Sequence, residues 1–246
     1  MKIIKNSLII IFVLSLFACN SGTNADINNS NGNNIIQGDS NTIIVIHEKL
    51  KNIYCKQIED IIQLSKGNLL CHQTIKGETV SLTFKGKENF YPLAEYNANN
   101  IPQVSNLANL VSNIYHSFDT LYKEPDYYID MFIFATSDGH KMDSPILYHG
   151  KNVDCDCFTP TITTSSIIHL INGNLQVNNK TLGCARAGAF YSKLVENGVN
   201  PSVVKLNGKE LILKGGEYRY IEITINFNNV LKYNPKFEIC DICKNL

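Results

Sequence analysis

One arginine inside an otherwise apolar helical pattern constrains this chain more than any other feature. Downstream of Thr181, apolar side chains recur at three- and four-residue spacing and form one helical face: Leu182, Ala189, Phe190, Leu194 and Val195. Asn197 and Gly198 follow, a pair that favours the left-handed conformation in which helices often end. The pattern therefore predicts a helix over residues 181–196. On most amphipathic helices an arginine such as Arg186 lies on the solvated side, with its aliphatic stem along the surface.

The residues around Arg186 favour a more specific interpretation. The chain fits the pattern N-x-x-L-S-x-x-R-A-x-x-V-x-x-x-L at five positions: Asn179, Leu182, Arg186, Ala187 and Leu194. This pattern is the signature of the OmpA-like peptidoglycan-binding domain, which the chain therefore resembles. Gly183 replaces the serine of the signature and Phe190 replaces its valine.

The order of predicted elements agrees with that resemblance. Alternation and apolar runs predict strands over 79–84, 127–136, 201–206 and 218–225, and helical periodicity predicts a helix over 99–122. Residues 89–94 resemble the loop that follows the first strand of the family. Residues 218–223 resemble its closing N-R-R-V-E-I, with Tyr220 in place of the second arginine. We expect an α+β fold, a β-α-β-α-β-β sandwich with helices on one face of a mixed sheet, over residues 79–227.

The resemblance also implies a binding site. In the family, an aspartate from a G-H-T-D turn and the signature arginine together hold the diamino acid of the peptidoglycan stem peptide. By position these residues are Asp138 and Arg186, and Asn179 of the signature joins them as a candidate. A carboxylate can pair with the ammonium group of the ligand, while a guanidinium binds its carboxylate through two hydrogen bonds. Asp138 precedes a glycine, so it could equally be an ordinary turn former.

Two features depart from the family pattern. The glycine and histidine of the turn are replaced by Ala135 and Thr136. Asp138 and Arg186 are also separated by a long insertion, at about 140–177, where family members have a short loop. Long loops are usually functional. The insertion could cover the site, reshape it or change its ligand.

The N-terminus resembles a lipoprotein signal peptide. Lys2 and Lys5 flank an apolar run from Leu8 to Leu14, and Leu-Phe-Ala precedes Cys19. The run is too short to span a membrane, which takes about 20 apolar residues. The resemblance implies that residues 1–18 are removed and that Cys19 carries acyl chains, which would anchor the protein stably. Asn20 favours the outer membrane as the destination.

Three further segments lie outside the predicted domain. Residues 19–45 comprise the lipidated cysteine and an Asn-rich flexible tether, with a small hairpin predicted near its end, at 35–45. Residues 46–78 comprise a helix, at 46–66, and a connector. Residues 228–246 form a C-terminal tail with a CxxC pair.

Seven cysteines remain beyond Cys19, and in an exported protein they predict disulfides with at least one thiol left over. Disulfides that tie the insertion and the tail to the domain are one possibility. The other is a four-thiolate zinc site formed by Cys155, Cys157, Cys240 and Cys243. A nucleophilic Cys184 with a histidine of the insertion, His140, His149 or His169, would be an enzymatic alternative. The chain shows no recognised nucleophile motif, so we predict no enzyme and no cofactor.

The sequence therefore predicts an outer-membrane lipoprotein, anchored through Cys19, whose domain faces the periplasm and binds the peptidoglycan stem peptide non-covalently. The alternative is an OmpA-like interaction module that has lost this site and recognises another envelope protein or an external protein through its insertion. Lys and Arg together number 22, as do Asp and Glu, so no excess of positive charge points to a nucleic-acid partner.

Overall fold

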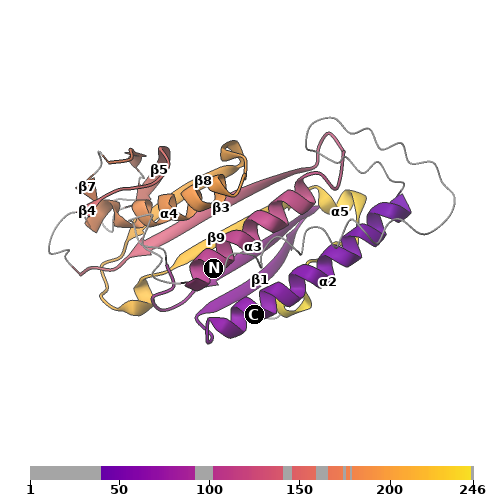
Figure 1. Ribbon diagram of the computed structural model, residues 1–246, viewed down its shortest axis with the longest axis horizontal. Helices are drawn as coiled ribbons and strands as arrows, with labels where there is room; N and C mark the ends of the chain where they lie inside the picture. The colour runs from indigo at the N-terminus through magenta and orange to yellow at the C-terminus, as the bar shows by residue number, and fades with distance from the viewer. Residues whose placement is uncertain are drawn as a thin grey trace, which may run out of the picture. The chain divides into compact units, whose positions relative to one another are not determined.

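A seven-stranded mixed sheet organises the folded chain, and helices cover one of its faces (Figure 1). The structure is a computed structural model that describes residues 40–91, 102–140, 146–158, 166–173, 176–177 and 179–244. Cys19 and the rest of the predicted signal peptide and tether up to residue 39 lie outside the described residues.

Hydrogen bonding gives the strand order β1-β2-β9-β3-β8-β5-β6. The strands are β1 (Leu69–Lys76), β2 (Thr79–Gly86), β3 (Tyr128–Ser137), β5 (Val153–Phe158), β6 (Ser166–Leu170), β8 (Val204–Glu210) and β9 (Ile221–Asn228). β8 runs parallel to both β3 and β5, and all other pairs are antiparallel. β4 (Ile146–Leu147) and β7 (Gln176–Val177) form a separate two-stranded ladder.

The two faces of the sheet differ in polarity because side chains alternate along each strand. In β9, Ile221, Ile223 and Ile225 are buried under the helices, while the residues between them reach the other face. There, Thr83 and Thr224 are hydrogen-bonded across β2 and β9 at 2.9 Å. The sheet therefore has one apolar face, and only that face needs helices.

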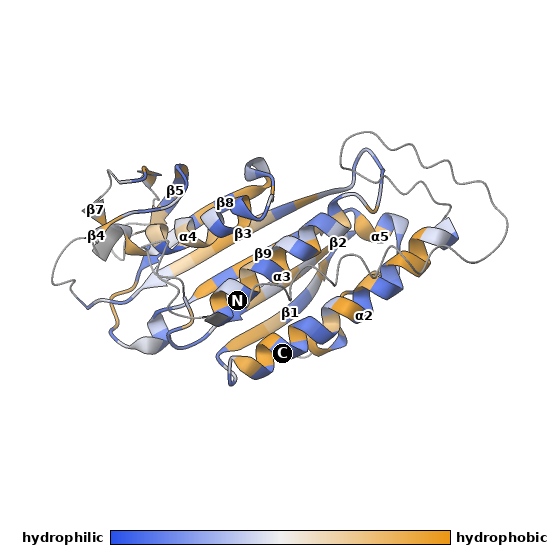
Figure 2. Cartoon of the chain, viewed as in Figure 1, coloured by the Kyte–Doolittle hydropathy of each residue, from blue (hydrophilic) through white to orange (hydrophobic). Residues whose placement is uncertain are grey.

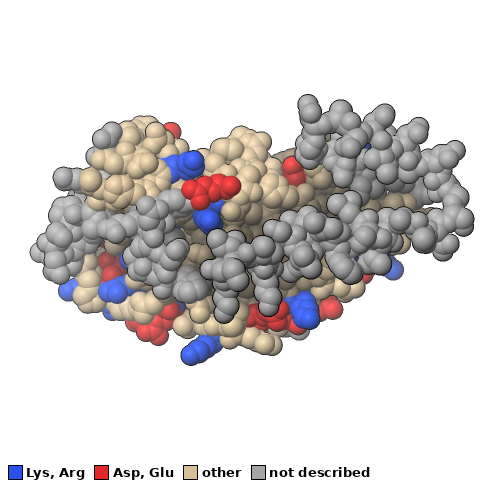
Figure 3. Space-filling model, in the orientation of Figure 1, with Lys and Arg blue, Asp and Glu red and all other residues tan. Residues whose placement is uncertain are grey.

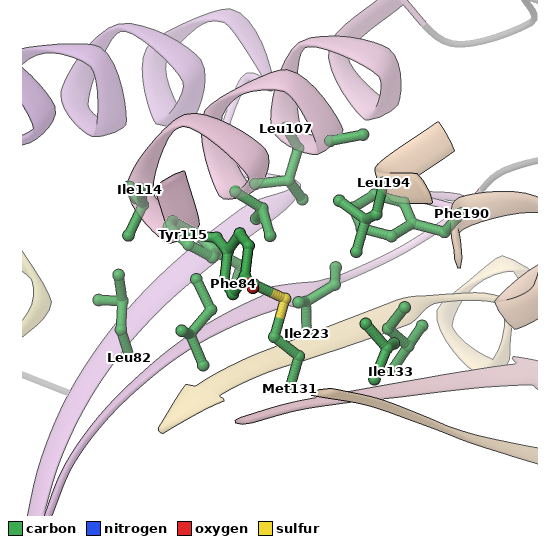
Figure 4. Packing of buried hydrophobic residues seen from close by; sticks show 14 of the residues in the cluster. Leu82, Phe84, Leu107, Ile114, Tyr115, Met131, Ile133, Phe190, Leu194 and Ile223 are labelled. Atoms are coloured by element: carbon green, nitrogen blue, oxygen red, sulfur yellow. The ribbon is translucent and has the colours of Figure 1, made fainter. Parts of the chain in front are cut away.

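Among the described residues, three long helices cover the apolar face: α2 (Ser40–Leu64), α3 (Pro102–Asp119) and α4 (Asn179–Glu196). Their apolar and polar residues separate to opposite sides, as Figure 2 shows for α2 and α3. Figure 4 shows side chains of α3 and α4 packed on those of β2, β3 and β9. They include Leu107, Ile114, Phe190 and Leu194 from the helices and Leu82, Phe84, Met131, Ile133 and Ile223 from the sheet.

Helix α4 lies unusually close to the strands beneath it because glycines remove the side chains that would separate them. A Cβ atom at Gly183 would lie 2.7 Å from the backbone nitrogen of Lys209 and 2.8 Å from the carbonyl oxygen of Ala135. A Cβ atom at Gly208 in β8 would lie 2.2 Å from the backbone nitrogen of Cys184. Glycine at 183, where the signature has serine, is therefore a packing requirement of this chain.

The C-terminal tail folds back onto α2 and β1. It contains α5 (Val230–Tyr233) and a 3-10 turn at Asp241–Cys243, and two disulfides fix it: Cys55–Cys240 to α2 and Cys71–Cys243 to β1. Buried His47 of α2 stacks on Phe237 with ring centroids 4.7 Å apart. The tail is thus an integral part of the core.

The predicted α+β fold, with helices on one face of a mixed sheet, is confirmed. The predicted hairpin is wrong for residues 40–45, which open helix α2, and its first residues lie outside the described part. Strand β1 was not predicted, since residues 69–76 were interpreted as part of a connector. The described part of the insertion contributes four strands, and β5 and β6 extend the main sheet beyond β8.

Two further observations bear on the sequence predictions. The predicted four-thiolate zinc site is wrong. Cys240 and Cys243 form disulfides with Cys55 and Cys71, while Cys155 and Cys157 lie against Cys184. Among the described residues, no helix combines the length and the apolar character needed to cross a membrane.

Candidate functional site

A cluster of charged side chains lies where the chain leaves strand β3. Asp138 follows directly after β3, Arg219 precedes β9, and Arg186 projects from α4, which packs over the same strands. Parallel pairing of β3 with β8 and antiparallel pairing with β9 bring these segments together. We call Asp138, Arg186, Arg219 and His140 the charged cluster.

Asp138 is the acidic member, and only 5 % of its side chain is exposed. Its Oδ2 accepts hydrogen bonds from Arg219 Nη2 at 3.0 Å, from the backbone nitrogen of Gly215 at 3.2 Å, and from His140 Nδ1. Burial alone would raise the pKa of this carboxyl, but the three donors outweigh it and hold the pKa well below its usual range. Asp138 is therefore a carboxylate at any physiological pH.

Arg186 is buried, with 7 % of its surface exposed. Its Nη1 donates to the carbonyl oxygen of Thr136 at 2.6 Å, and its guanidinium lies over the ring of Tyr91, 3.8 Å from the centroid. Its Nε is buried and has no hydrogen-bond partner among the described residues. Burial lowers the pKa of Arg186 to about 10, so the side chain remains a cation at neutral pH.

Thr136 holds the cluster together through both its backbone and its side chain. Its Oγ1 donates to the carbonyl oxygen of Tyr218 at 2.8 Å and accepts from the backbone nitrogen of Tyr220 at 3.1 Å. These bonds fix the segment that carries Arg219 against the end of β3. The hydroxyl of Thr136 therefore positions the segment of Arg219, while its backbone carbonyl holds Arg186.

The charges of the cluster do not balance. Two guanidinium groups, Arg186 and Arg219, face one carboxylate, Asp138, and each arginine has a buried Nε without a partner among the described residues. Arg219 is the better compensated, because its hydrogen bond to Asp138 raises its pKa. A buried polar donor that lacks a hydrogen bond is costly, and a charged one more so. An anionic group next to the two arginines would therefore be electrostatically favoured.

The structure places the predicted site residues as follows. Asp138 and Arg186 belong to the same cluster, where the charge of Asp138 acts to raise the pKa of Arg186 against the larger effect of burial. Asn179 is the first residue of α4, but its side chain lies outside the described part of the chain. Two residues of the site, Tyr91 and Arg219, were not predicted. Tyr91 lies in the segment 89–94 that resembles the family loop, of which the structure describes residues 89–91, and Arg219 lies in the segment that resembles N-R-R-V-E-I. Both resemblances were visible in the sequence, without a role attached to either residue.

Comparisons with known proteins give similarities at low identity. No family model and no curated protein matches the chain. Among solved structures, the OmpA-like domain of FopA1 from Francisella tularensis is 12% identical, with a TM-score of 0.31 over 65% of this chain and 82% of that one. A putative MotB-like protein from Desulfovibrio vulgaris is 8% identical, with a TM-score of 0.35 over 73% of this chain and 98% of that one. The periplasmic domain of Helicobacter pylori MotB is 12% identical, with a TM-score of 0.32 over 63% and 78%.

Charge on the surface is mixed. On the face that Figure 3 shows, basic and acidic side chains lie in small groups of both signs. The cation of Arg186, by contrast, is buried, and burial strengthens its effect on a ligand.

Proposed function

We propose that this chain binds peptidoglycan non-covalently, through the charged cluster, and that lipid on Cys19 anchors it in the outer membrane. It would then tether that membrane to the cell wall without catalysis. The observation that carries the proposal is the buried Arg186, a cation whose Nε has no partner among the described residues. A ligand carboxylate would supply the missing acceptor.

The stem peptide of peptidoglycan suits the cluster chemically. Its diamino acid presents both a carboxylate and an ammonium group. Arg186 offers the carboxylate a planar fork of donors, which binds carboxylates through two hydrogen bonds. Asp138 offers the ammonium group a permanent negative charge, and its described hydrogen bonds all reach Oδ2. Oδ1 would accept the ligand.

Preorganisation supports the same proposal. Arg186 is held by Thr136 and stacked on Tyr91, and Asp138 is held by three donors. Neither side chain would lose much conformational freedom when a ligand binds, which lowers the entropic cost of association. Because both groups are shielded from water, their pairing with the ligand would contribute more than an exposed ion pair does.

The test is sedimentation of the full chain, in mild detergent, with purified peptidoglycan sacculi. We expect the protein to pellet with intact sacculi and to stay in the supernatant with sacculi whose stem peptides an amidase has removed. Binding to both preparations would place recognition on the glycan and contradict the proposed role of the cluster. A supernatant protein in both cases would favour the alternative, an interaction module that binds a protein partner.

The anchor has its own test. Growth with an alkyne-tagged fatty acid should label the wild-type chain and leave Cys19→Ser unlabelled. If both chains take up the label equally, Cys19 is not the acylated residue.

A further inference from the structure

Three buried cysteines outside the charged cluster converge on one point. Cys155 and Cys157 of β5 and Cys184 of α4 are 1%, 3% and 0% exposed, and their sulfur atoms all lie within 4.8 Å of one another. Cys184 lies within disulfide reach of Cys155 and of Cys157. The four remaining cysteines among the described residues form the two disulfides of the tail.

The convergence follows from the backbone. Cys155 and Cys157 are two residues apart on a strand, so their side chains point to the same face of the sheet, the face that α4 covers. Gly208 of β8 pairs with Cys157 and lies directly beneath Cys184. A Cβ atom at position 208 would come within 2.7 Å of the Cys184 sulfur. The glycine therefore makes room for Cys184 beside both strand cysteines.

A sulfur atom forms one disulfide at a time, so the two bonds to Cys184 are alternatives. Chain entropy does not choose between them, because the bonds would close loops with sequence separations of 29 and 27 residues. In either arrangement one strand cysteine is left as a thiol next to a disulfide. A thiol in that position is the reactant of thiol–disulfide exchange.

We propose that Cys155, Cys157 and Cys184 form an internal exchange site, in which one disulfide moves between the two strand cysteines. The free strand cysteine loses its proton, and its thiolate attacks the Cys184 sulfur. The new sulfur–sulfur bond forms as the old one breaks, and the displaced thiolate takes up a proton. The step oxidises and reduces nothing overall, so it needs no external oxidant or reductant.

Such a site would keep strand β5 fastened to α4 whichever strand cysteine is bonded. The third thiol would stay buried and sheltered from oxidants in solution, since oxidation of cysteine follows exposure and thiolate character. Arg186 is two residues from Cys184 on the same helix. The disulfide thus anchors the helix that carries this arginine, independently of what the charged cluster binds.

The experiment is disulfide mapping of the full chain, made in an oxidising compartment and purified without reductant. The native protein is quenched in acid, which protonates thiols and stops exchange, and its thiols are then blocked with a maleimide under denaturing acid conditions. A protease that cleaves before aspartate separates the two strand cysteines, because Asp154 and Asp156 precede them. Each possible link to Cys184 then gives its own peptide mass.

We expect both links in comparable amounts, with one blocked thiol per chain among the seven cysteines beyond Cys19. Cys155→Ser should convert fully to the bond from Cys157 to Cys184, and Cys157→Ser to the bond from Cys155 to Cys184. Protein that has been fully reduced and reoxidised should return to the wild-type ratio, because exchange makes the ratio an equilibrium property.

Three results would overturn the proposal. The first is that the wild type contains only one of the two links to Cys184, and that replacing the strand cysteine of that link leaves Cys184 without a disulfide. The second is a ratio that depends on the history of the sample, which would indicate two trapped populations. The third is three free thiols together with one equivalent of zinc in the purified chain, which would indicate a metal site instead.

Discussion

Replacement of Arg186 by methionine should separate binding from stability. Methionine retains much of the volume and the apolar stem of arginine but removes the guanidinium. Binding to peptidoglycan sacculi should fall by about 10- to 150-fold, because a hydrogen bond to a charged group contributes about 1.5–3 kcal/mol and each 1.4 kcal/mol is a tenfold change. The conservative variant Arg186→Lys should lose nearly as much affinity, since lysine retains the charge but lacks the planar fork.

Stability should respond differently. The methionine variant loses the bond from Nη1 to the Thr136 carbonyl and the contact with the Tyr91 ring, which together contribute about 2–5 kcal/mol. It also removes a buried cation whose Nε has no described partner, and the desolvation of such an ion costs several kcal/mol. The two effects nearly cancel. We expect the free energy of unfolding without ligand to stay within about 2 kcal/mol of the wild-type value.

Two measurements check this reasoning: the sacculus concentration that pellets half of the protein, and urea unfolding followed by circular dichroism. Lys193→Met is the matched control, because Lys193 lies on the same helix with 39% of its side chain exposed, and it should change neither quantity. Wild-type affinity in a folded Arg186→Met chain would refute the role of the arginine in binding. A loss of more than about 4 kcal/mol of stability would show that Arg186 serves mainly the fold.

Four further outcomes follow from the structure. In Asp138→Asn, the free energy of unfolding should fall less steeply than in the wild type as the pH is lowered into the acid range. The pKa of Asp138 is lowered in the folded state, so its contribution is present above the unfolded value of about 3.9 and is lost as pH falls toward the folded value; urea midpoints between pH 3 and 7 test this. Burial lowers the pKa of His47 in the folded state, so its contribution to stability is lost as pH falls from the unfolded pKa of about 6.5 toward the lower folded pKa. The melting temperatures of His47→Gln at pH 7 and pH 5 should therefore differ less than those of the wild type. Replacing both Cys71 and Cys243 by serine should lower the free energy of unfolding by about 3 kcal/mol, measured by urea unfolding. With the Cys55–Cys240 disulfide in place, the Cys71–Cys243 bond closes a ring of only about 20 residues, which sets this magnitude. Gly183→Ala should lower stability by about 1–3 kcal/mol by forcing α4 away from the backbone of β3 and β8, whereas Gly173→Asn, at an open left-handed position, should cost less than about 1 kcal/mol in the same denaturation assay.

Elements with a strong period could be predicted from the sequence. Helix α4 and strand β3 begin and end within two residues of their predicted bounds. In α4 the apolar residues repeat with the 3.6-residue period of a helix, and in β3 they form a continuous run typical of a buried strand. The start of α2 could not be predicted in this way. Its β-branched residues Ile43, Ile44 and Val45 favour a strand locally, but Ile43 packs on the core as part of the helix.

Strand β1 has a weak signal for a physical reason. Only Leu69 and Cys71 in its first half are fully buried, while its last three residues, apolar Ile75 among them, are exposed, so no alternation extends along it. Disulfides between the tail and the domain were one of the two predictions for the cysteines and are confirmed, but their pairing could not be predicted, since cysteine spacing alone does not fix connectivity.

For the charged cluster, the sequence supplied the residue types but not the pairing. Resemblance to a known signature pointed to Asp138 and Arg186. That Arg219 is the direct partner of Asp138 depends on the register between β3 and β9, in which Ala135 pairs with Ile221. A shift of two residues in that register would move Arg219 away from the carboxylate, and no local sequence pattern encodes it.

The two tail disulfides also determine how the fold would bear mechanical load. A pull on the chain ahead of Ser40 would act first on the N-terminal turns of α2, which would have to release Ile43 and His47 from their packing as they unwind. Unwinding would stop at Cys55, where the force passes through covalent bonds to the tail and from there, through Cys243, to Cys71 in the sheet. Beyond that point the remainder of α2 and the tail cannot separate from β1 without breaking a sulfur–sulfur bond, so under tension the protein would lengthen by a few helical turns and then resist further extension.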